Sequence, residues 1–178
     1  AYQIEAGVAS VQLDRIAASS TMSTSVAQQA FQAALSGGIN AALTATRLAP
    51  SDYQNWLILG NLYSKAVPLR VSGAYDSAKD AYEKAALLSP TNPQIPYILA
   101  QLNIANQNIK SAKDNLKAAI ALKQDYTDAI FLLSQLEVQD GNVKEALAAA
   151  LAAAYFTPNN QNILFQVGIL SAALGDFV

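Results

Sequence analysis

The chain has 178 residues, of which 52% are hydrophobic and 13% are charged, and its formal net charge is -2. This length permits one domain with a continuous buried core, and the sparse, scattered charge argues against nucleic acids and anionic membranes as partners. Because neither cysteine nor histidine occurs, disulfides, thiolate or imidazole catalysis and the usual metal ligands are excluded, and we expect no cofactor and no metal.

The first 50 residues are predicted to form two helices, at 2–18 and 26–48. The polar, Ser/Thr-rich stretch 19–25 joins them as a loop, which is either a plain linker or, in an exported protein, a carrier of sugars. Gly37 and Gly38 are expected to interrupt the second helix. They would cost it about 2 kcal/mol relative to two alanines if it stays helical.

Residues 53–90 are predicted to form a helix pair, at 53–66 and 74–88. Six extra residues within 64–73 are expected in the turn between these helices, because Pro68 fits poorly in a helix interior. This insertion is either a neutral surface loop or a functional one.

The remaining residues repeat with a step of 34, as Tyr97, Phe131 and Phe165 show. Small residues keep the same step, for example Ala112 and Ala146, and let antiparallel helices approach closely. The predicted helices are 93–106, 109–122, 127–139, 143–156 and 161–174. Candidate helix caps and turn residues are Asp52, Asn92, Asp125 or Thr127, and Gly141.

Residues 53–90 also carry a set of signature residues: Trp56, Leu59, Gly60, Tyr63, Gly73, Tyr75, Ala78, Tyr82, Ala85 and Pro90. With the 34-residue step, this pattern resembles the tetratricopeptide repeat (TPR) family. The resemblance implies an all-α, TPR-like α-solenoid of about four and a half antiparallel helix pairs, with Trp56, Leu59, Tyr82, Ala112 and Ala146 buried. The expected single domain, 1–178, comprises a degenerate pair (1–50), a repeat with the insertion (53–90), two repeats (93–126 and 127–160) and a half repeat (161–178).

Four segments, 50–56, 67–75, 89–93 and 125–131, are more narrowly similar to the C-terminal TPR region of O-antigen-ligase-like membrane proteins of uncultivated bacteria. This resemblance implies an extracytoplasmic or cell-surface setting within a larger glycan-assembly protein. The longest strongly apolar run, 146–156, is about half of the ~20 residues that span a bilayer, so we expect no direct membrane insertion by this segment. Without an initiator Met or a signal-peptide pattern, the chain is expected to be a processed product or an excised domain.

The TPR resemblance also places a binding groove on the first helix of each pair, at the fifth and ninth positions of the repeat. By this register the groove residues are Leu57, Asn61, Tyr97, Gln101, Phe131, Gln135, Phe165 and Ile169. None is a cation, which argues against the carboxylate clamp of chaperone-binding members and favours an apolar, amide-lined site for a peptide segment. Alternatively, Tyr97, Phe131 and Phe165 only pack between neighbouring helices.

Both ends of the predicted solenoid are apolar and lack a cap. Burial of the exposed apolar side chains at these ends would be favourable, so we hypothesise head-to-tail self-association into a filament. The expected interface residues are Ile4, Val8, Val11, Leu164, Val167, Leu170, Leu174 and Phe177. The rest of a longer parent chain could instead cover the C-terminal end.

Residues suited to catalysis are few. Asp125 with Asp128, or Glu137 with Asp140 and Glu145, could form paired carboxylates, but capping and solvation at helix ends explain them better. No nucleophile motif, phosphate loop or dinucleotide fingerprint occurs. We therefore expect a non-catalytic protein whose partners are copies of itself or a peptide segment.

Overall fold

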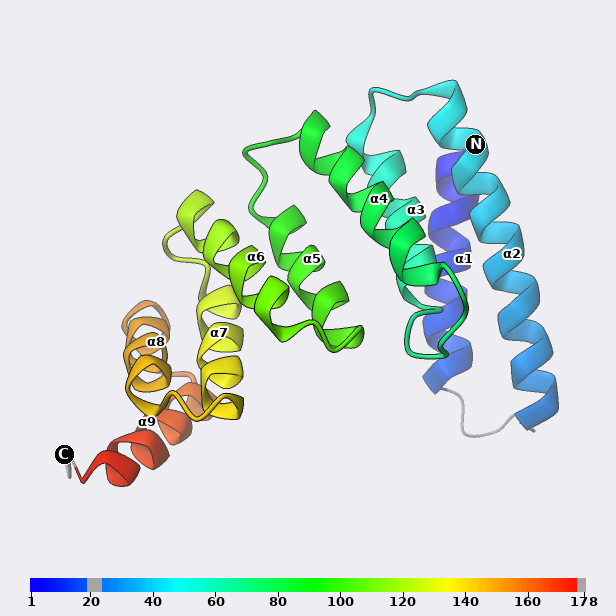
Figure 1. Ribbon diagram of the computed structural model, residues 1–178. Helices are drawn as coiled ribbons and strands as arrows, with labels where there is room; N and C mark the ends of the chain where they lie inside the picture. Colours follow the sequence, from blue (N-terminus) through cyan, green and yellow to red (C-terminus); the bar gives the residue numbers. More distant parts are fainter. Residues whose placement is uncertain (19–23, 176–178) are drawn as a thin grey trace. The chain divides into compact units, whose positions relative to one another are not determined.

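The computed structural model describes residues 1–18 and 24–175, and these residues form helices and turns without a strand. The helices are α1 (Tyr2–Ala18), α2 (Thr24–Leu48), α3 (Tyr53–Ser64), α4 (Ala74–Leu88), α5 (Gln94–Ala105), α6 (Ile109–Leu122), α7 (Thr127–Gln139), α8 (Val143–Phe156) and α9 (Gln161–Leu174) (Figure 1). The all-α prediction is confirmed. Every predicted helix end lies within two residues of the observed one. The Ser/Thr-rich stretch falls largely outside the described residues.

The contacts divide the chain into two compact units, Ala1–Pro90 and Thr91–Val178. Helices that follow one another pack together within each unit: α1 on α2, α3 on α4, α5 on α6, and α7 on α8. This is the antiparallel pairing that the repeat predicts. The units are described separately, and the single domain at 1–178 stays a prediction.

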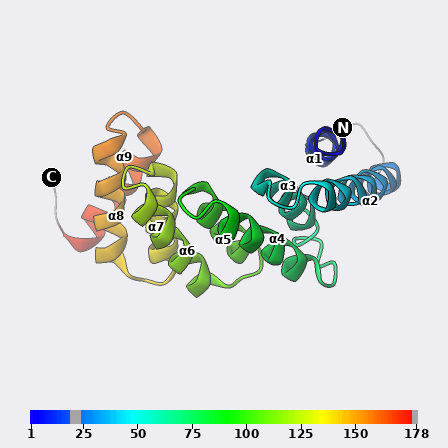
Figure 2. The same ribbon diagram turned by 90° about the horizontal axis from the view of Figure 1, so that it is seen from above.

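In the first unit, α2 runs without a break through Gly37 and Gly38, so the predicted interruption is wrong. A Cβ on Gly38 would lie 2.8 Å from the Ala9 Cβ and 3.1 Å from Leu62 Cδ2. Glycine therefore lets α2 approach both α1 and α3 closely, and this packing offsets its low helix propensity. Figure 2 shows α1 end-on beside α2 and α3.

The Leu59-Gly60 signature is explained by the ring of Tyr82 in α4. A Cβ on Gly60 would lie 2.5 Å from two atoms of that ring, so only glycine leaves it room. Leu59 and Tyr82 are buried as predicted, whereas Trp56 is only half-buried. Trp56 differs because its ring N–H reaches out to the carbonyl of Pro50, at 2.8 Å.

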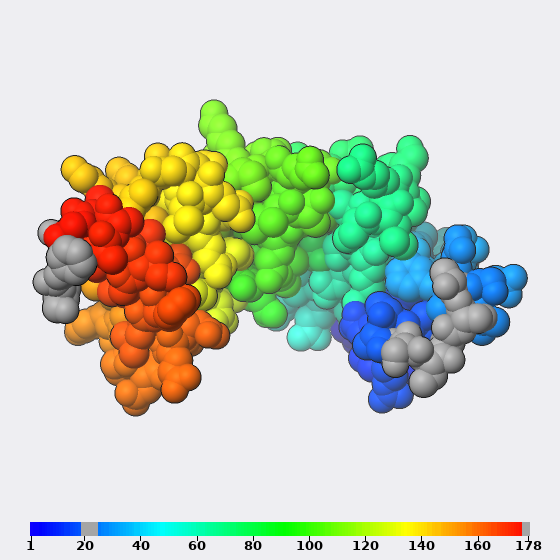
Figure 3. All heavy atoms as spheres, turned by 90° about the horizontal axis from the view of Figure 1, so that it is seen from below, coloured from blue at the N-terminus to red at the C-terminus, as the bar shows by residue number. Residues whose placement is uncertain are grey.

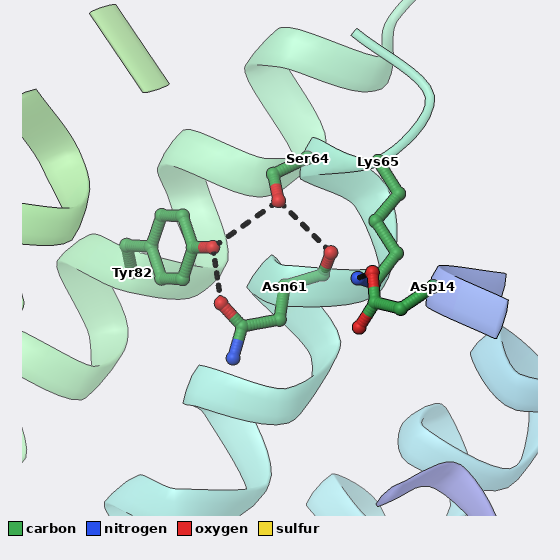
Figure 4. Close-up of polar contacts among 5 residues, drawn as sticks. All are labelled: Asp14, Asn61, Ser64, Lys65 and Tyr82. Atoms are coloured by element: carbon green, nitrogen blue, oxygen red, sulfur yellow. Dashed lines mark hydrogen bonds and ion pairs between the residues drawn. The ribbon is translucent and has the colours of Figure 1, made fainter. Parts of the chain in front are cut away.

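The six-residue insertion lies in the turn between α3 and α4, as predicted. Ala66 and Val67 are buried, so the first half of the turn is part of the core and only the second half is a surface loop. Arg70 and Gly73 have positive φ angles, of 55° and 73°, which close the turn. The Nζ atom of the preceding Lys65 lies 2.5 Å from the Asp14 carboxylate of α1 (Figure 4).

In the second unit, buried residues follow the 34-residue step. The core includes Ile95, Ala129 and Ile163 on the first helices of the repeats, and Ala112 and Ala146 on the second helices. The small side chains of the second helices allow close packing, and the large side chains of Ile95 and Ile163 on the first helices fill the space beside them.

The predicted helix caps are confirmed in part. Asp52 accepts a hydrogen bond from the Gln54 amide at 3.0 Å, and Asn92 accepts one from the Gln94 amide at 3.0 Å. Neither Asp125 nor Thr127 caps α7, which begins after Tyr126 without a side-chain cap. There Thr127 Oγ1 donates to the Asp125 carbonyl instead.

Candidate functional site

A pocket of about 700 Å³ in the second unit lies along α7 and α9, with one residue from α5 at its edge. Its lining residues are Ile104, Phe131, Leu132, Gln135, Leu136, Val138, Gln139, Asn162, Phe165, Gln166, Ile169 and Leu170. We call this pocket the α7/α9 groove. No ionisable residue is found among the described residues that line it. It brings together four of the predicted groove residues, Phe131, Gln135, Phe165 and Ile169.

The two phenylalanines of the groove differ in how freely they can meet a ligand. Phe165 is 72% exposed, so its ring is available for contact. Phe131 is half-buried and packs against a cluster that contains Ile130, Ala153 and Ile163. The sequence left open whether these rings line a binding groove or only pack between helices. Phe165 is placed to line the groove, whereas Phe131 both packs in the core and lines the groove.

Amide side chains supply the polar part of the α7/α9 groove. Gln135, Gln139 and Asn162 are exposed and can each donate and accept hydrogen bonds. Gln166 is held in place, because its Nε2 donates to Ser134 Oγ at 2.8 Å. The groove can therefore satisfy the backbone of an extended or helical segment while its rings bury apolar side chains.

Tyr97 and Gln101, predicted for the same role, lie on α5 outside this pocket. The Tyr97 ring is half-buried and packs against Tyr126, with the ring centroids 5.1 Å apart. Burial raises the pKa of the Tyr97 phenol, the Asp128 charge raises it further, and a hydrogen bond with Gln101 lowers it. This pairing favours the packing alternative for Tyr97.

Leu57 and Asn61 lie on α3 in the first unit. Asn61 Oδ1 accepts a hydrogen bond from the Tyr82 hydroxyl at 2.7 Å, so this amide already has a partner inside the protein (Figure 4). Burial raises the pKa of Tyr82 to about 12, against a smaller lowering by its hydrogen bond to Ser64. The sequence missed this role of Asn61, because Tyr82 lies on the partner helix.

Known structures share this arrangement of paired helices, although no family model and no curated protein matches the sequence. A crystal structure of MamA is 22% identical over 87% of this chain and 86% of that chain, with a TM-score of 0.68. YrrB, described as a TPR protein with an unusual peptide-binding site, is 24% identical over 80% of this chain and 70% of its own, with a TM-score of 0.60. The chain has the TPR fold.

A further TPR structure, the first TPR of Spaghetti (RPAP3), is bound to an HSP90 peptide with the sequence SRMEEVD. It is 26% identical over 70% of this chain and 96% of that chain, with a TM-score of 0.58. That peptide ends in acidic residues, whereas the described lining of the α7/α9 groove is uncharged. The described lining of the α7/α9 groove thus offers no cation that could pair with such acidic side chains.

The predicted self-association residues of α1 lie as expected. Ile4, Val8 and Val11 are all exposed, with Ile4 at 71%. They share one side of the helix, while Ala6 and Leu13 on the opposite side are buried against the rest of the first unit.

The predicted self-association residues of α9 need a correction. Leu164 is exposed, Val167 and Leu174 are half-buried, and Leu170 is only 4% exposed. Leu170 is buried because α9 turns it toward Ala146 and Ala150 of α8. Leu170 is thus a core residue and not part of an open end. Phe177 lies outside the described residues.

Two of the carboxylates considered for catalysis, Glu137 and Asp140, belong to an ion-pair network. Lys113 Nζ lies 2.7 Å from Glu137 Oε2 and 2.5 Å from Asp140 Oδ2, and Asn142 Nδ2 donates to Glu137 Oε2 at 2.7 Å. Burial raises the pKa of Glu137, but hydrogen bonds from Asn142 and Lys113 outweigh it, and the net shift is downward. A carboxylate held ionised by a lysine is suited to joining α6 to α7 and unsuited to general acid chemistry.

Within residues 1–18 and 24–175, no group of acidic side chains lies close enough together to hold a metal ion. None of the helices at 1–18 and 24–175 has the length and apolar character needed to cross a bilayer.

Proposed function

We propose that this chain is a non-catalytic protein-interaction scaffold that binds an uncharged, apolar peptide segment in the α7/α9 groove. The observation that carries the proposal is the lining of this groove, where exposed Phe165 and Ile169 stand beside the amides of Gln135 and Asn162. Burying apolar side chains of a ligand against Phe165 and Ile169 would supply affinity, at about 25 cal/mol per Å². Peptide binding by TPR proteins of similar fold supports the same reading.

The test is selection from a displayed library of random peptides, followed by titration of the enriched peptides. We expect enrichment of uncharged peptides with aromatic or branched aliphatic residues. Phe165→Ala should weaken their binding about tenfold or more and leave stability nearly unchanged, because the ring is exposed. Tyr155→Ala, at an exposed ring on α8 outside the groove, is the matched control. Equal binding by both variants, or enrichment of acidic peptides, would contradict the proposal.

Head-to-tail self-association into a filament is a second candidate function. The exposed stripe Ile4, Val8 and Val11 on α1 and the exposed Leu164 on α9 favour it. Val8→Glu would place a charge in a desolvated contact and should abolish association, as judged by sedimentation of both proteins at matched high concentration. A wild type that sediments as a monomer would rule this candidate out.

We also propose an extracytoplasmic or cell-surface setting, as the soluble region of a larger glycan-assembly protein. The support for this is the sequence similarity of the segments 50–56, 67–75, 89–93 and 125–131 to O-antigen-ligase-like proteins. The test is fractionation of the source cells, followed with an antibody raised against this chain. Recovery with the cytoplasmic fraction would contradict the proposal.

A further inference from the structure

The second helices of the repeats share an exposed face. It consists of four positions with the spacing i, i+3, i+4 and i+7, which lie on one side of a helix. In α4 these positions hold Asp80, Glu83, Lys84 and Leu87, and in α6 they hold Asp114, Lys117, Ala118 and Ala121. All of these side chains are exposed. Charged residues at such positions keep this face of α4 and α6 in water.

In α8 the same four positions are all apolar. They hold Ala148, Leu151, Ala152 and Tyr155, which we call the α8 stripe. Each of them is exposed, Leu151 at 50% and Tyr155 at 81%. Another side of α8, with Ala146, Ala150 and Ala153, is buried, so the stripe is not the side that packs in the core. Figure 3 shows part of α8, in deep yellow, at the surface of the second unit.

A following repeat leaves this face of a second helix open. In the second unit α6 is followed by α7 and α8, and Asp114, Lys117, Ala118 and Ala121 of α6 are exposed all the same. The exposure of the α8 stripe therefore follows from the geometry of the repeat. What distinguishes α8 is the loss of charge on this face, and a contiguous exposed apolar patch is typical of an interaction surface.

The α8 stripe is complementary to itself when two copies run antiparallel. A two-fold axis between Leu151 and Ala152 puts Leu151 opposite Ala152 of the second copy. The same axis puts Ala148 opposite Tyr155 of the second copy. Each large side chain then meets a small one, which is the alternation that lets facing helices interdigitate. In a parallel pair, Tyr155 would instead face Tyr155, and the alanines would face each other across a gap.

The charges of α8 also favour the antiparallel pair. Its ionised side chains are Lys144 and Glu145, at the start of the helix. Around the same axis they face Asn159 and Pro158 of the second copy, which follow the end of α8, so both charges stay in water. The two Glu145 residues lie about 20 Å apart along the helix axes, which exceeds the Debye length of about 8 Å at physiological ionic strength. A parallel pair would bring these like charges together.

Tyr155, the largest side chain of the stripe, is held in place before any partner binds. Its ring packs edge-on against Phe156, with the ring centroids 5.2 Å apart and an interplanar angle of 79°. The helix itself is fixed by its packing on α7 and α9. Docking of a second helix therefore costs little ordering entropy. The tyrosine hydroxyl lies at the end of the stripe, where it can remain in water.

We propose that the α8 stripe binds the α8 stripe of a second copy of this chain, antiparallel, in a closed two-fold dimer. The contact is isologous, so it occupies both surfaces and stops at two copies, whereas head-to-tail association would add copies end to end. One stripe from each copy buries less than about 1,200 Å², so the dimer is weak and forms at high concentration. The stripe shares no residue with the α7/α9 groove, so the inference does not depend on the proposed peptide binding.

Disulfide formation tests the geometry, since the natural chain has no cysteine. In the antiparallel pair the two copies of Ala152 are offset by about 1.5 Å along the helix axes, and the two copies of Ala148 by about 10.5 Å. A disulfide forms readily only when the Cα atoms lie about 4.4–6.8 Å apart. Ala152→Cys should therefore form a linked dimer about tenfold faster or more than Ala148→Cys, an exposed alanine of the same stripe. Each rate is divided by the rate at which that thiol reacts with a small disulfide reagent. Equal or reversed rates would overturn the proposal.

A charge within the stripe tests the association itself. All proteins in this comparison carry Val8→Glu, which would remove a head-to-tail contact. Leu151→Glu would bury a carboxylate at the centre of the dimer without a counterion, so dimerisation measured by sedimentation equilibrium should weaken about tenfold or more. The matched control is Leu87→Glu, at a leucine of α4 that is 77% exposed, and it should leave the dimer unchanged. Equal association of the two variants, or a parent protein that stays monomeric at high concentration, would overturn the proposal.

Discussion

Gln166 on α9 donates a hydrogen bond from its Nε2 to Ser134 Oγ on α7, at 2.8 Å, and Ser134 in turn donates to the Ala146 carbonyl on α8, at 2.7 Å. A single buried hydroxyl thus joins three helices beneath the α7/α9 groove. It holds the Gln166 amide at the groove surface. The groove therefore depends on a polar contact that lies within the core.

Ser134→Ala should lower the free energy of unfolding by about 1 kcal/mol, because it removes the two hydrogen bonds through which one hydroxyl joins α7 to α8 and α9. Urea unfolding of the variant checks this. Gln139→Ala, at an exposed amide of the same helix, is the control and should change stability by less than about 0.5 kcal/mol. Equal effects of the two substitutions would show that the hydroxyl does not join the helices.

Gly60→Ala and Gly168→Ala should change stability in opposite directions. At Gly60 a Cβ would lie 2.5 Å from the Tyr82 ring, so the substitution should destabilise by about 1–3 kcal/mol through overpacking. At Gly168 there is open space within a helix, so alanine should stabilise by about 0.5–1 kcal/mol. Chemical denaturation of both variants at neutral pH measures the difference. A stabilised Gly60→Ala protein would contradict the observed packing.

Tyr82 should make the first unit unstable in alkali. Burial raises the pKa of Tyr82 to about 12, while its unfolded value is about 10, so the folded state holds this proton more tightly. The stabilisation is complete below pH 10 and is lost as the pH rises from about 10 to about 12. At 1.36 kcal/mol per unit, the full loss is about 3 kcal/mol.

The measurement is the free energy of unfolding across this alkaline range for the wild type and Tyr82→Phe. Phenylalanine has no proton to lose, so the variant should lack this part of the pH dependence. All other residues are the same in both proteins, so their contribution to the pH dependence cancels in the comparison. Parallel curves would show that Tyr82 is not the group responsible.

The Lys113 network should be sensitive to acid. Hydrogen bonds from Asn142 and Lys113 outweigh burial and hold the pKa of Glu137 below its ordinary value. The stabilisation is therefore present above that ordinary value, about 4.3, and is lost as the pH falls through the lower folded value. Glu137→Gln should remove this acid dependence and destabilise the protein at pH 7 by about 2 kcal/mol.

The control for this network is Glu145→Gln, an exposed carboxylate in the first turn of α8. It should leave the acid dependence of unfolding close to that of the wild type. An acid transition that persists unchanged in Glu137→Gln would place its origin in another carboxylate.

The sequence by itself determined the helices and the repeat. Hydrophobic periodicity and the 34-residue step predicted the nine helices found in residues 1–18 and 24–175. The same step places Phe131 and Phe165 at equivalent positions of successive repeats. Both patterns can be recognised from residues that are close together in the sequence or repeat at a fixed spacing. Gly141 was likewise predicted as a turn residue, and its φ is 76°. Such features can be predicted without knowing which other helices each residue contacts.

Only the tertiary structure decided which of these side chains remain free. Leu170 was expected at an open surface and is buried, because the rotation of α9 on α8 is set by how Ala146 and Ala150 pack. Asn61 was expected to meet a ligand and instead bonds Tyr82, and Gly38 was expected to break a helix and instead lets α2 approach α1 and α3. The periodicity of a helix fixes which residues share a face. What covers that face depends on packing between segments far apart in the chain.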